Sequence, residues 1–399
     1  MKKFENAATT EKSPKWENAI KRENVLYTPS YGDNTMRTEF DRDYTRIINS
    51  RAYRRLRNKT QVFFAPRNDH ICTRIEHVTL VESIAHTISE YLGLNCELTK
   101  AIATAHDIGH SPFGHQGEYI LSEISQREFG KKFWHEKNGV RLVDNLELLP
   151  DYDGNLRNMN LTYAVRDGII SHCGEVTEKG LKPREEAIDL EQYNRANEYA
   201  PYTWEGCVVK IADTIAYIGR DIEDAKIMNL LSEREIAQFD KIIEDVKIQN
   251  SNLINYFVVD LCNNSNLEKG LTFSNKVYET MKLILEFNYK KIYKNAKIAP
   301  SIRYFKVVIN ELYYTLKNEF DGINTLKRLK KMKRYYPNLS LEFADWLSNY
   351  IETEDRENHK NKIVYDLNKI EDYENAIIDY ISGMTDQYII SVYNEIVSF

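Results

Sequence analysis

Long apolar runs are missing from this 399-residue sequence. A helix that crosses a bilayer needs about 18 or more consecutive, mostly apolar residues, and no stretch of that kind occurs. The first segment begins with two lysines, but no apolar core follows them. We therefore expect neither an export signal nor a membrane segment.

Cysteine is also scarce. The five cysteines are odd in number, widely spaced and never arranged as Cys-X-X-Cys: Cys72, Cys96, Cys173, Cys207 and Cys262. This pattern argues against a disulfide framework and against a zinc site built from thiolates. A reducing compartment fits it best, so we expect a cytoplasmic protein.

An excess of positive charge is absent as well, because the formal net charge is -6. A protein without an overall basic field must bind phosphate-bearing partners through a local cationic site or a metal. The chain has 42% hydrophobic and 29% charged residues, whereas disordered chains lack the apolar fraction that offsets the entropy of ordering. A packed globular protein is therefore expected.

Apolar residues recur at helical spacing along most of the chain, without the alternation typical of strands, so we expect an all-α fold. Residues 1–35 are polar and end in a turn-rich segment, which predicts an N-terminal arm that is either mobile or a partner-binding strap. Residues 36–230 are predicted to form the functional helical core. Residues 231–399 are predicted to add C-terminal helices packed on that core.

The functional residues are expected on or beside helices at 40–58, 76–92, 97–105 and 203–226. The first of these is rich in arginine and has an apolar face, which most simply indicates a solvated basic helix. Loops are expected at 147–160 and 174–196, where they would be insertions or lids near a site.

Histidines and carboxylates gather on these helices. His77 lies on the inward face of its helix, while His106 and Asp107 stand at a helix end that Gly109 helps to break. Asp213 lies on a polar stripe of a further helix. A lone histidine is more often a core or surface residue than a ligand, but several ligand types converge here beside a rigid turn. We therefore expect these four residues to hold a metal.

Two imidazoles and two carboxylates form a mixed nitrogen and oxygen set. Such a set suits Mn2+, Mg2+, Fe2+, Co2+, Ni2+ or Zn2+ and leaves room for water and phosphate oxygens. A divalent ion lowers the pKa of a bound water and polarises a phosphoryl group. The set therefore predicts phosphoryl hydrolysis, with redox chemistry as the alternative.

The ligand order H…HD…D resembles the signature of the HD-domain superfamily of metal phosphohydrolases. Longer motifs, in the same order along the chain, resemble the deoxynucleoside triphosphate (dNTP) triphosphohydrolases of the dGTPase family. These motifs are RRLRNKTQVF (54–63), RIEH (74–77), HDIGHSPFGHQGE (106–118) and KIADTIAYIGRDIEDA (210–225). Ser111 departs from the pattern, because proline is frequent at that position. The resemblance implies an HD-domain helical core.

The resemblance also implies a sugar site. Gln61 and Asp221 are expected to hold the 3′-hydroxyl of a deoxyribose, and Tyr217 is expected to pack where a 2′-hydroxyl would clash. Asp213, Tyr217 and Asp221 are spaced by four residues, so one helix face would offer a metal ligand, a sugar gate and a sugar acceptor. The alternative is an ordinary solvated helix face.

By the same resemblance, His115 and Glu118 match the family's catalytic pair. Their three-residue spacing on a helical turn lets the carboxylate orient the imidazole, which would activate water or protonate the leaving oxygen. His110 and His135 match positions that line the phosphates, and Arg74 matches one that holds a phosphate oxygen. The alternatives are an ordinary ion pair for Arg74 and a helix-end residue for His135.

The reaction implied by the family is attack of water at the α-phosphorus, which releases a deoxynucleoside and inorganic triphosphate, with dGTP as a candidate substrate. Two alternatives stay open. One is another HD-type nucleotide phosphohydrolase. The other is a weakly catalytic nucleotide sensor or nucleic-acid-binding protein that uses the arginine-rich helix and the basic segment 326–334. The resemblance further implies a homo-oligomer, a tetramer or hexamer, with a dNTP or single-stranded nucleic acid as effector.

Overall fold

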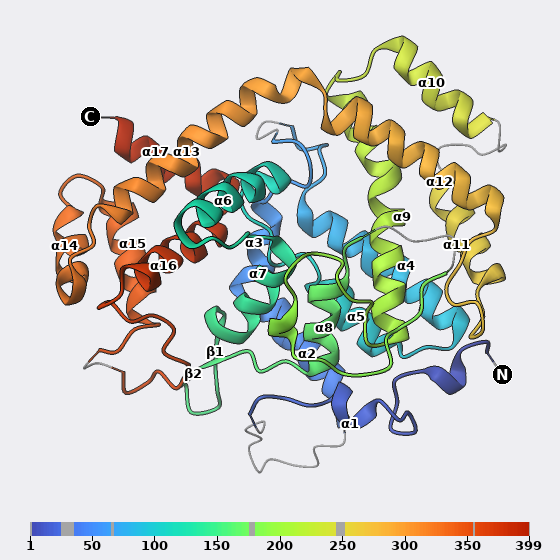
Figure 1. Cartoon of the computed structure of the whole chain (residues 1–399), viewed down its shortest axis with the longest axis horizontal. Helices are drawn as coiled ribbons and strands as arrows, with labels where there is room; N and C mark the ends of the chain where they lie inside the picture. The colour runs from blue at the N-terminus through green and yellow to red at the C-terminus, as the bar shows by residue number, and fades with distance from the viewer. Residues whose placement is uncertain are drawn as a thin grey trace.

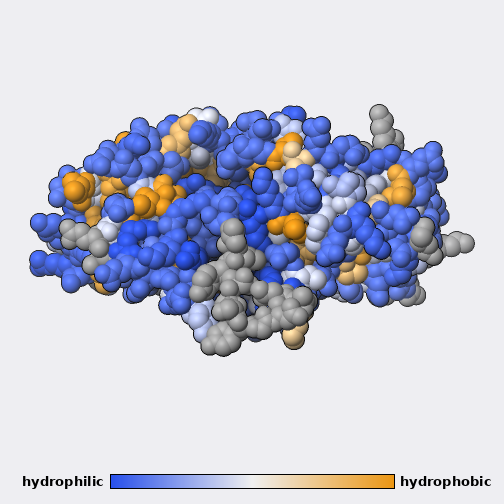
Figure 2. All heavy atoms as spheres, turned by 90° about the horizontal axis from the view of Figure 1, so that it is seen from below, coloured by the Kyte–Doolittle hydropathy of each residue, from blue (hydrophilic) through white to orange (hydrophobic). Residues whose placement is uncertain are grey.

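The computed structural model describes residues 2–24, 36–64, 68–174, 180–244, 252–353 and 356–398. These residues are mostly helical, which confirms the expected all-α fold (Figure 1). Two short strands, β1 (Leu148–Pro150) and β2 (Leu156–Asn158), pair antiparallel as a hairpin within the predicted loop 147–160. None of the described helices is long and apolar enough to span a membrane. On the face shown in Figure 2, hydrophobic residues form small separate patches on a mostly hydrophilic surface.

The helices of the first 230 residues are α1 (Trp16–Ala19), α2 (Glu39–Asn49), α3 (Arg51–Arg55), α4 (Arg74–Leu92), α5 (Cys96–Ala105), α6 (Gly114–Phe129), α7 (His135–Arg141), α8 (Tyr163–Ser171) and α9 (Trp204–Ile227). The C-terminal helices are α10 (Glu233–Glu244), α11 (Leu253–Asn264), α12 (Asn275–Asn288), α13 (Ala299–Lys317), α14 (Thr325–Met332), α15 (Pro337–Ser348), α16 (Ile370–Ser382) and α17 (Asp386–Val397). Figure 1 shows α14 to α16 on the left and α10 to α12 on the right.

Three helices, α4, α5 and α9, pack against one another at the centre of the fold. Their starts are stabilised by side chains that pair with free amides: the carboxylate of Glu76 accepts from the amide of Thr73, and Asn95 accepts from two amides of α5. Thr203 accepts from an amide of α9 in the same way. Helix α4 ends at Gly93, whose φ of 88° lies in the left-handed region that favours glycine. Local signals therefore define both ends of the helices that carry the site.

The arginine-rich segment predicted as one helix over 40–58 is interrupted at Ser50. This residue has extended backbone (ψ 153°), ends α2 and begins α3, and a short 3₁₀ turn follows over Leu56–Asn58. The Ser50 hydroxyl donates to the carbonyl of Ile47 (2.7 Å) and accepts from the amide of Tyr53 (3.1 Å). The prediction of a continuous helix was wrong because the serine side chain replaces the helical backbone bonds at this point.

Residues 2–24 of the predicted N-terminal arm lie against the core, so the mobile alternative is wrong for this part. The buried ring of Phe4 packs edge-on against Trp204, with ring centroids 4.9 Å apart. The amide and hydroxyl of Thr9 both donate to the carboxylate of Glu205 (2.9 and 2.7 Å). Residues 25–35 of the arm lie outside the described residues. The described part is a strap fixed to the start of α9.

The C-terminal helices contribute to two apolar clusters. The first cluster contains the buried residues of α4, α5 and α9 and extends through α11 and α12 to Ile292. The second surrounds α6 and contains the buried residues of α13 and α15 to α17, starting at Phe305. Within the C-terminal region the clusters thus divide between Ile292 and Phe305, whereas the sequence predicted a boundary after residue 230. Helices α11 and α12 therefore extend the core that carries the site.

We expect Phe4→Ala to destabilise the fold. Removing a fully buried phenyl ring leaves a cavity, which lowers the free energy of unfolding by about 3 to 5 kcal/mol. Urea unfolding followed by circular dichroism measures this change. The control is Lys12→Ala, which removes an exposed side chain of the same strap. Equal unfolding midpoints for the two variants would show that the strap unfolds independently of the core.

Candidate functional site

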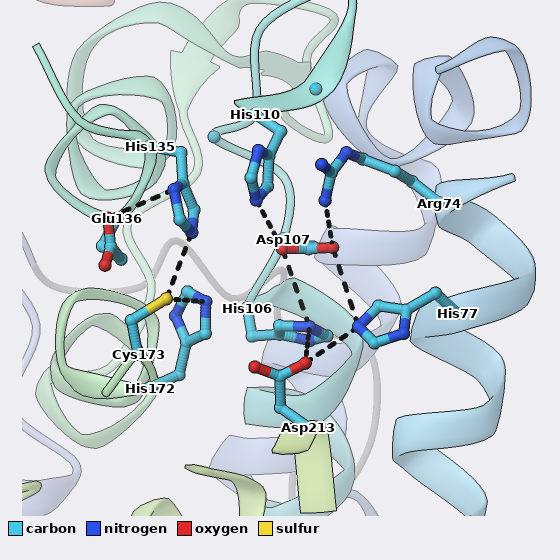
Figure 3. A network of polar contacts seen from close by, with 12 residues as sticks. Arg74, His77, His106, Asp107, His110, His135, Glu136, His172, Cys173 and Asp213 are labelled. Atoms are coloured by element: carbon cyan, nitrogen blue, oxygen red, sulfur yellow. Dashed lines mark hydrogen bonds and ion pairs between the residues drawn. The ribbon is translucent and has the colours of Figure 1, made fainter. Parts of the chain in front are cut away.

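Three helical elements that are distant in the sequence bring the predicted metal ligands together (Figure 3). His77 lies on α4 and Asp213 on α9, and His106 and Asp107 follow the last residue of α5. The distance from His77 Nε2 to Asp213 Oδ1 is 2.9 Å. His106 Nε2 lies 3.9 Å from Asp213 Oδ1 and 3.7 Å from Asp107 Oδ1. The ligand atoms of His77, His106 and Asp213 thus lie within 4.8 Å of one another, and Asp107 lies beside the two imidazoles.

The donor set fits a divalent metal. His106 Nδ1 is 2.7 Å from the carbonyl of Ala103, so Nδ1 carries the proton and Nε2 has a free lone pair. This Nε2 is buried and has no hydrogen-bond partner among the residues that the structure describes. A buried polar atom without a partner is costly, and a cation at the centre would accept its lone pair.

Neighbouring groups keep Asp107, a predicted metal ligand, ionised. Burial by itself raises the pKa of this carboxyl, but Arg74, His110 and His106 hold the pKa well below its usual range. Arg74 Nη1 is 2.7 Å from Asp107 Oδ2, and His110 Nε2 is 3.0 Å from Asp107 Oδ1. The carboxylate form is the one that binds a metal.

The turn that carries His106 and Asp107 depends on a close backbone approach. At Gly109, an added Cβ would lie 2.0 Å from the carbonyl oxygen of His135 and 2.3 Å from the amide nitrogen of Gly139. The start of α7 therefore packs directly on the turn, and only glycine leaves the space for it. This contact brings His135, from α7, to the side of the site.

Arg74 is buried beside the predicted metal ligands and makes an ion pair. Its side chain is 1% exposed, and besides binding Asp107 it donates from Nη2 to the backbone carbonyl of Gln61 (3.2 Å). Its Nε atom has no hydrogen-bond partner among the described residues. The guanidinium thus supports a predicted metal ligand directly, and its contact with a phosphate oxygen stays a prediction.

His115, Glu118 and His135 form a polar group beside the predicted metal ligands. Glu118 Oε2 lies 3.3 Å from His115 Nδ1 and 3.1 Å from His135 Nδ1, so one carboxylate contacts both imidazoles. The side chain of His115 is 66% exposed, whereas that of His135 is buried. The pairing of His115 with Glu118 matches the geometry expected from their spacing, and places a solvent-accessible imidazole at the edge of the site.

His110 and His135 are stacked, with ring centroids 3.6 Å apart. Burial by itself lowers the pKa of His135, but the carboxylates of Glu136 and Glu118 raise it to about 9. Burial and the positive charges of Arg74 and His135 hold the pKa of His110 well below its usual range. A cationic imidazole therefore stacks on a neutral one, next to the predicted metal ligands.

The predicted sugar residues offer two buried acceptors. Gln61 Oε1 and Asp221 Oδ1 have no hydrogen-bond partner within the described part of the chain. The other oxygen of Asp221 accepts a hydrogen bond from the hydroxyl of Tyr293, a residue that the sequence analysis did not identify. Burial raises the pKa of Asp221 to about 7 and also raises the pKa of Tyr217, which lies half-buried one turn earlier on α9. A ligand hydroxyl is the kind of donor that these acceptors lack.

The structure adds His172 and Cys173, which sequence reasoning missed. The ring of His172 packs edge-on against His106, with centroids 4.9 Å apart, and its Nε2 lies 3.4 Å from Cys173 Sγ. The same sulfur lies 3.4 Å from His135 Nε2. Burial and the neighbouring imidazoles of His106 and His135 lower the pKa of His172 to about 4. The only sequence signal for these two residues was their adjacency at the end of α8, which is not a spacing typical of metal ligands.

The comparisons with known proteins agree with this geometry. The family model described as HD domain matches residues 74–218, the segment that contains all four predicted metal ligands. Several relatives bear the name deoxyguanosinetriphosphate triphosphohydrolase-like protein. The one from Caldanaerobacter subterraneus subsp. tengcongensis is 33% identical over 361 residues, which cover 90% of this chain and 85% of the relative.

Two further relatives have the same name. The one from Desulfatibacillum aliphaticivorans is 34% identical over 290 residues, which cover 72% of this chain and 76% of the relative. The one from Rickettsia felis is 30% identical over an alignment of 400 positions, which covers 91% of this chain and 92% of the relative. The similarity thus includes most of the C-terminal helices as well as the segment with the ligands.

We expect Asp107→Ala and Asp213→Ala each to abolish retention of a divalent metal, because each removes an anionic ligand from the buried centre. His115→Ala is the matched control, since its side chain lies at the exposed edge and its removal leaves the four ligands in place. Elemental analysis of the desalted proteins measures the bound metal. Wild-type metal content in Asp107→Ala or Asp213→Ala would contradict the ligand assignment for that residue.

Proposed function

The chain belongs to the HD-domain family of deoxyguanosinetriphosphate triphosphohydrolase-like proteins, and we propose that it hydrolyses dNTPs, dGTP among them, to deoxynucleoside and inorganic triphosphate. The observation that carries this proposal is the polar face of α9. There Asp213 contacts His77 at the predicted metal centre, and Asp221, two turns later, presents an unpartnered buried oxygen. Tyr217 lies between them. One helix thus contributes both a ligand of the predicted metal centre and an acceptor for a sugar hydroxyl.

The metal would be held by His77, His106, Asp107 and Asp213. When bound, a divalent ion supplies the Lewis acidity that phosphoryl transfer needs. The mixed set of imidazole and carboxylate donors is compatible with Mn2+, Mg2+, Fe2+, Co2+, Ni2+ and Zn2+. Arg74 keeps Asp107 ionised and oriented through its 2.7 Å contact.

Proton transfer is assigned to His115. Glu118 orients its imidazole through the Nδ1 contact of 3.3 Å, which leaves Nε2 to take a proton from the attacking water or give one to the departing oxygen. His135, with its pKa raised to about 9, carries positive charge at neutral pH and offers it to phosphate oxygens. His110, stacked on His135, lines the phosphates as a neutral imidazole.

Selection of deoxyribose is assigned to three residues. Gln61 and Asp221 hold the 3′-hydroxyl, which donates its one proton to one of their two unpartnered oxygens. The hydroxyl of Tyr293 donates to Asp221 and holds the carboxyl in place. The ring of Tyr217 fills the space that a 2′-hydroxyl would need, so a ribonucleotide is excluded by contact.

The assembly and an effector form a separate part of the proposal. We expect a homo-oligomer, a tetramer or hexamer, whose activity responds to a dNTP or to single-stranded nucleic acid. The similarity to the family supports this expectation. Light scattering with and without dNTPs measures the number of subunits.

The direct test of the function is a chromatographic product assay. We expect the purified protein with Mn2+ or Mg2+ to convert one or more of the four dNTPs, supplied singly and mixed, to deoxynucleoside and intact triphosphate. Release of orthophosphate or pyrophosphate would contradict attack at the α-phosphorus. Activity on nucleoside monophosphates or cyclic nucleotides without activity on dNTPs would assign the site to another HD-type phosphohydrolase. Tight binding of single-stranded nucleic acid without hydrolysis would favour a nucleotide sensor.

Tyr217→Ala should relax discrimination against ribonucleotides. Loss of the ring opens space for the 2′-hydroxyl, so the ratio of kcat/KM for dGTP over GTP should fall about 10- to 100-fold. Steady-state kinetics with both nucleotides measure this ratio. Tyr217→Phe is the matched control, because it keeps the ring and should retain the wild-type ratio. An unchanged ratio in Tyr217→Ala would remove this residue from the sugar site.

A further inference from the structure

The turn between α16 and α17, at residues 382–386, reaches the site from the far end of the chain. Asp386, the first residue of α17, is 3% exposed. Its Oδ1 accepts a hydrogen bond from the amide of Phe113 (2.8 Å), and its Oδ2 accepts from the amide of Thr60 (2.9 Å) and from the hydroxyl of the same threonine. One carboxylate therefore connects two segments that are themselves about fifty residues apart in the sequence.

The bond to Phe113 acts on the start of the helix that carries His115. Phe113 has a φ of 63°, an unfavourable backbone conformation for a residue with a side chain, and α6 begins at the next residue. Its ring is buried and stacked on Phe305 of α13, with centroids 4.0 Å apart. Phe64 packs edge-on against the same ring, with centroids 5.5 Å apart. The hydrogen bond to the amide and the stacking on the ring, however, both come from C-terminal helices, α17 and α13.

The bond to Thr60 acts on the segment that carries Gln61. The backbone on either side of this threonine is also tied to the start of α4, because the amide of Arg74 donates to the carbonyl of Lys59 (3.0 Å). The carbonyl on the other side of Thr60, that of Gln61, accepts from the side chain of Arg74 (3.2 Å). Asp386 is therefore bonded to the residue immediately before the predicted sugar acceptor.

Two more side chains join the same turn to the metal-binding segment. The buried ammonium of Lys59 donates to the carbonyl of His110 and to that of Ser382 (2.9 Å). The side-chain amide of Asn138 donates to the carbonyl of Gly109 (2.7 Å) and to the hydroxyl of Ser382 (3.3 Å). The α16–α17 turn is thus hydrogen-bonded to Phe113 directly, and to Gly109 and His110 through one side chain each.

We propose that Asp386 is a positioning residue for hydrolysis: it holds the segment before His115 and the segment before Gln61 in fixed relative positions, so that the C-terminal helices complete the catalytic site. This inference rests on the proposed function, since it names the groups that Asp386 positions. A displacement of about 1 Å in a catalytic group costs up to roughly 100-fold in rate, so a contact remote from the reacting atoms is sufficient.

The isosteric variant Asp386→Asn tests the proposal. An amide has a single oxygen, so it accepts from Phe113 or from Thr60 and presents an NH2 group to the other. We expect kcat for dNTP hydrolysis to fall about 10- to 100-fold with unchanged metal content. Asp379→Asn is the matched control. Asp379 is a similarly buried carboxylate on α16, but it pairs with Arg141 (2.6 Å) and Tyr365 (2.6 Å). This control should leave kcat close to the wild-type value.

A double-mutant cycle separates positioning from a general loss of stability. If Asp386 acts by placing His115, then Asp386→Asn should have little further effect on kcat once His115→Ala is present. A merely structural role predicts that the two losses multiply.

Thr60→Val is a second, milder variant that should preserve the fold, because it removes only the hydroxyl donor to Asp386. It should reduce kcat in the same direction by a smaller factor.

Hydrogen–deuterium exchange gives a readout that does not depend on substrate. Asp386→Asn should speed exchange in peptides covering 106–118 and 58–64, and Asp379→Asn should not. Wild-type kcat in Asp386→Asn, multiplicative losses in the cycle, or unchanged exchange in both peptides would each overturn the proposal. If the wild-type protein hydrolyses no dNTP, the proposed function fails, and the exchange measurement alone then decides whether Asp386 holds the two segments.

Discussion

The buried carboxylate of Asp107 is the group on which the rest of the site depends. A carboxylate removed from water is stable only where cationic or hydrogen-bonding groups surround it. Arg74 and His110 supply two such contacts, at 2.7 and 3.0 Å, and His106 lies beside them. These partners come from α4 and from the turn after α5, so the charge can be compensated only when the helices are packed together. A bound divalent cation would add to the same compensation.

The need to compensate the buried charge of Asp107 explains why the helices around it pack so closely. The backbone of α7 approaches Gly109 to a distance that excludes any side chain, and the approach brings His135 onto His110. The stacked pair then shares its surroundings with Glu118, which also contacts His115. The predicted metal ligands and the groups to which we assign proton transfer therefore belong to one continuous polar network. A change in helix packing would alter both functions together.

The C-terminal helices are part of this network. Helices α11 and α12 extend the apolar cluster of α4 and α9 and lead to Tyr293, whose hydroxyl donates to Asp221. Helices α13 to α17 form a second cluster around α6, and through Phe305 and Asp386 they hold Phe113 in an unfavourable backbone conformation. The similarity to two of the relatives covers about nine-tenths of the chain and so includes most of these helices. The C-terminal helices thus contribute contacts to the site in addition to those within the HD domain.

The sequence by itself determined the features that depend on neighbouring residues. Helical periodicity predicted the all-α fold, adjacency linked His106 with Asp107, and regular spacing linked Asp213, Tyr217 and Asp221. The family resemblance added the pair His115 and Glu118, whose spacing fits one turn of helix. Sequence reasoning missed the break at Ser50, where a side-chain hydrogen bond overrides an otherwise helical pattern, and the packing of residues 2–24. Only the tertiary structure decided which residues from distant parts of the chain contact the site residues. His172 packs beside His106, Tyr293 donates a hydrogen bond to Asp221, and Asp386 accepts one from Phe113. Such contacts join residues separated by tens to hundreds of positions, and local periodicity carries no information about them because it depends only on the few residues that share a turn of helix.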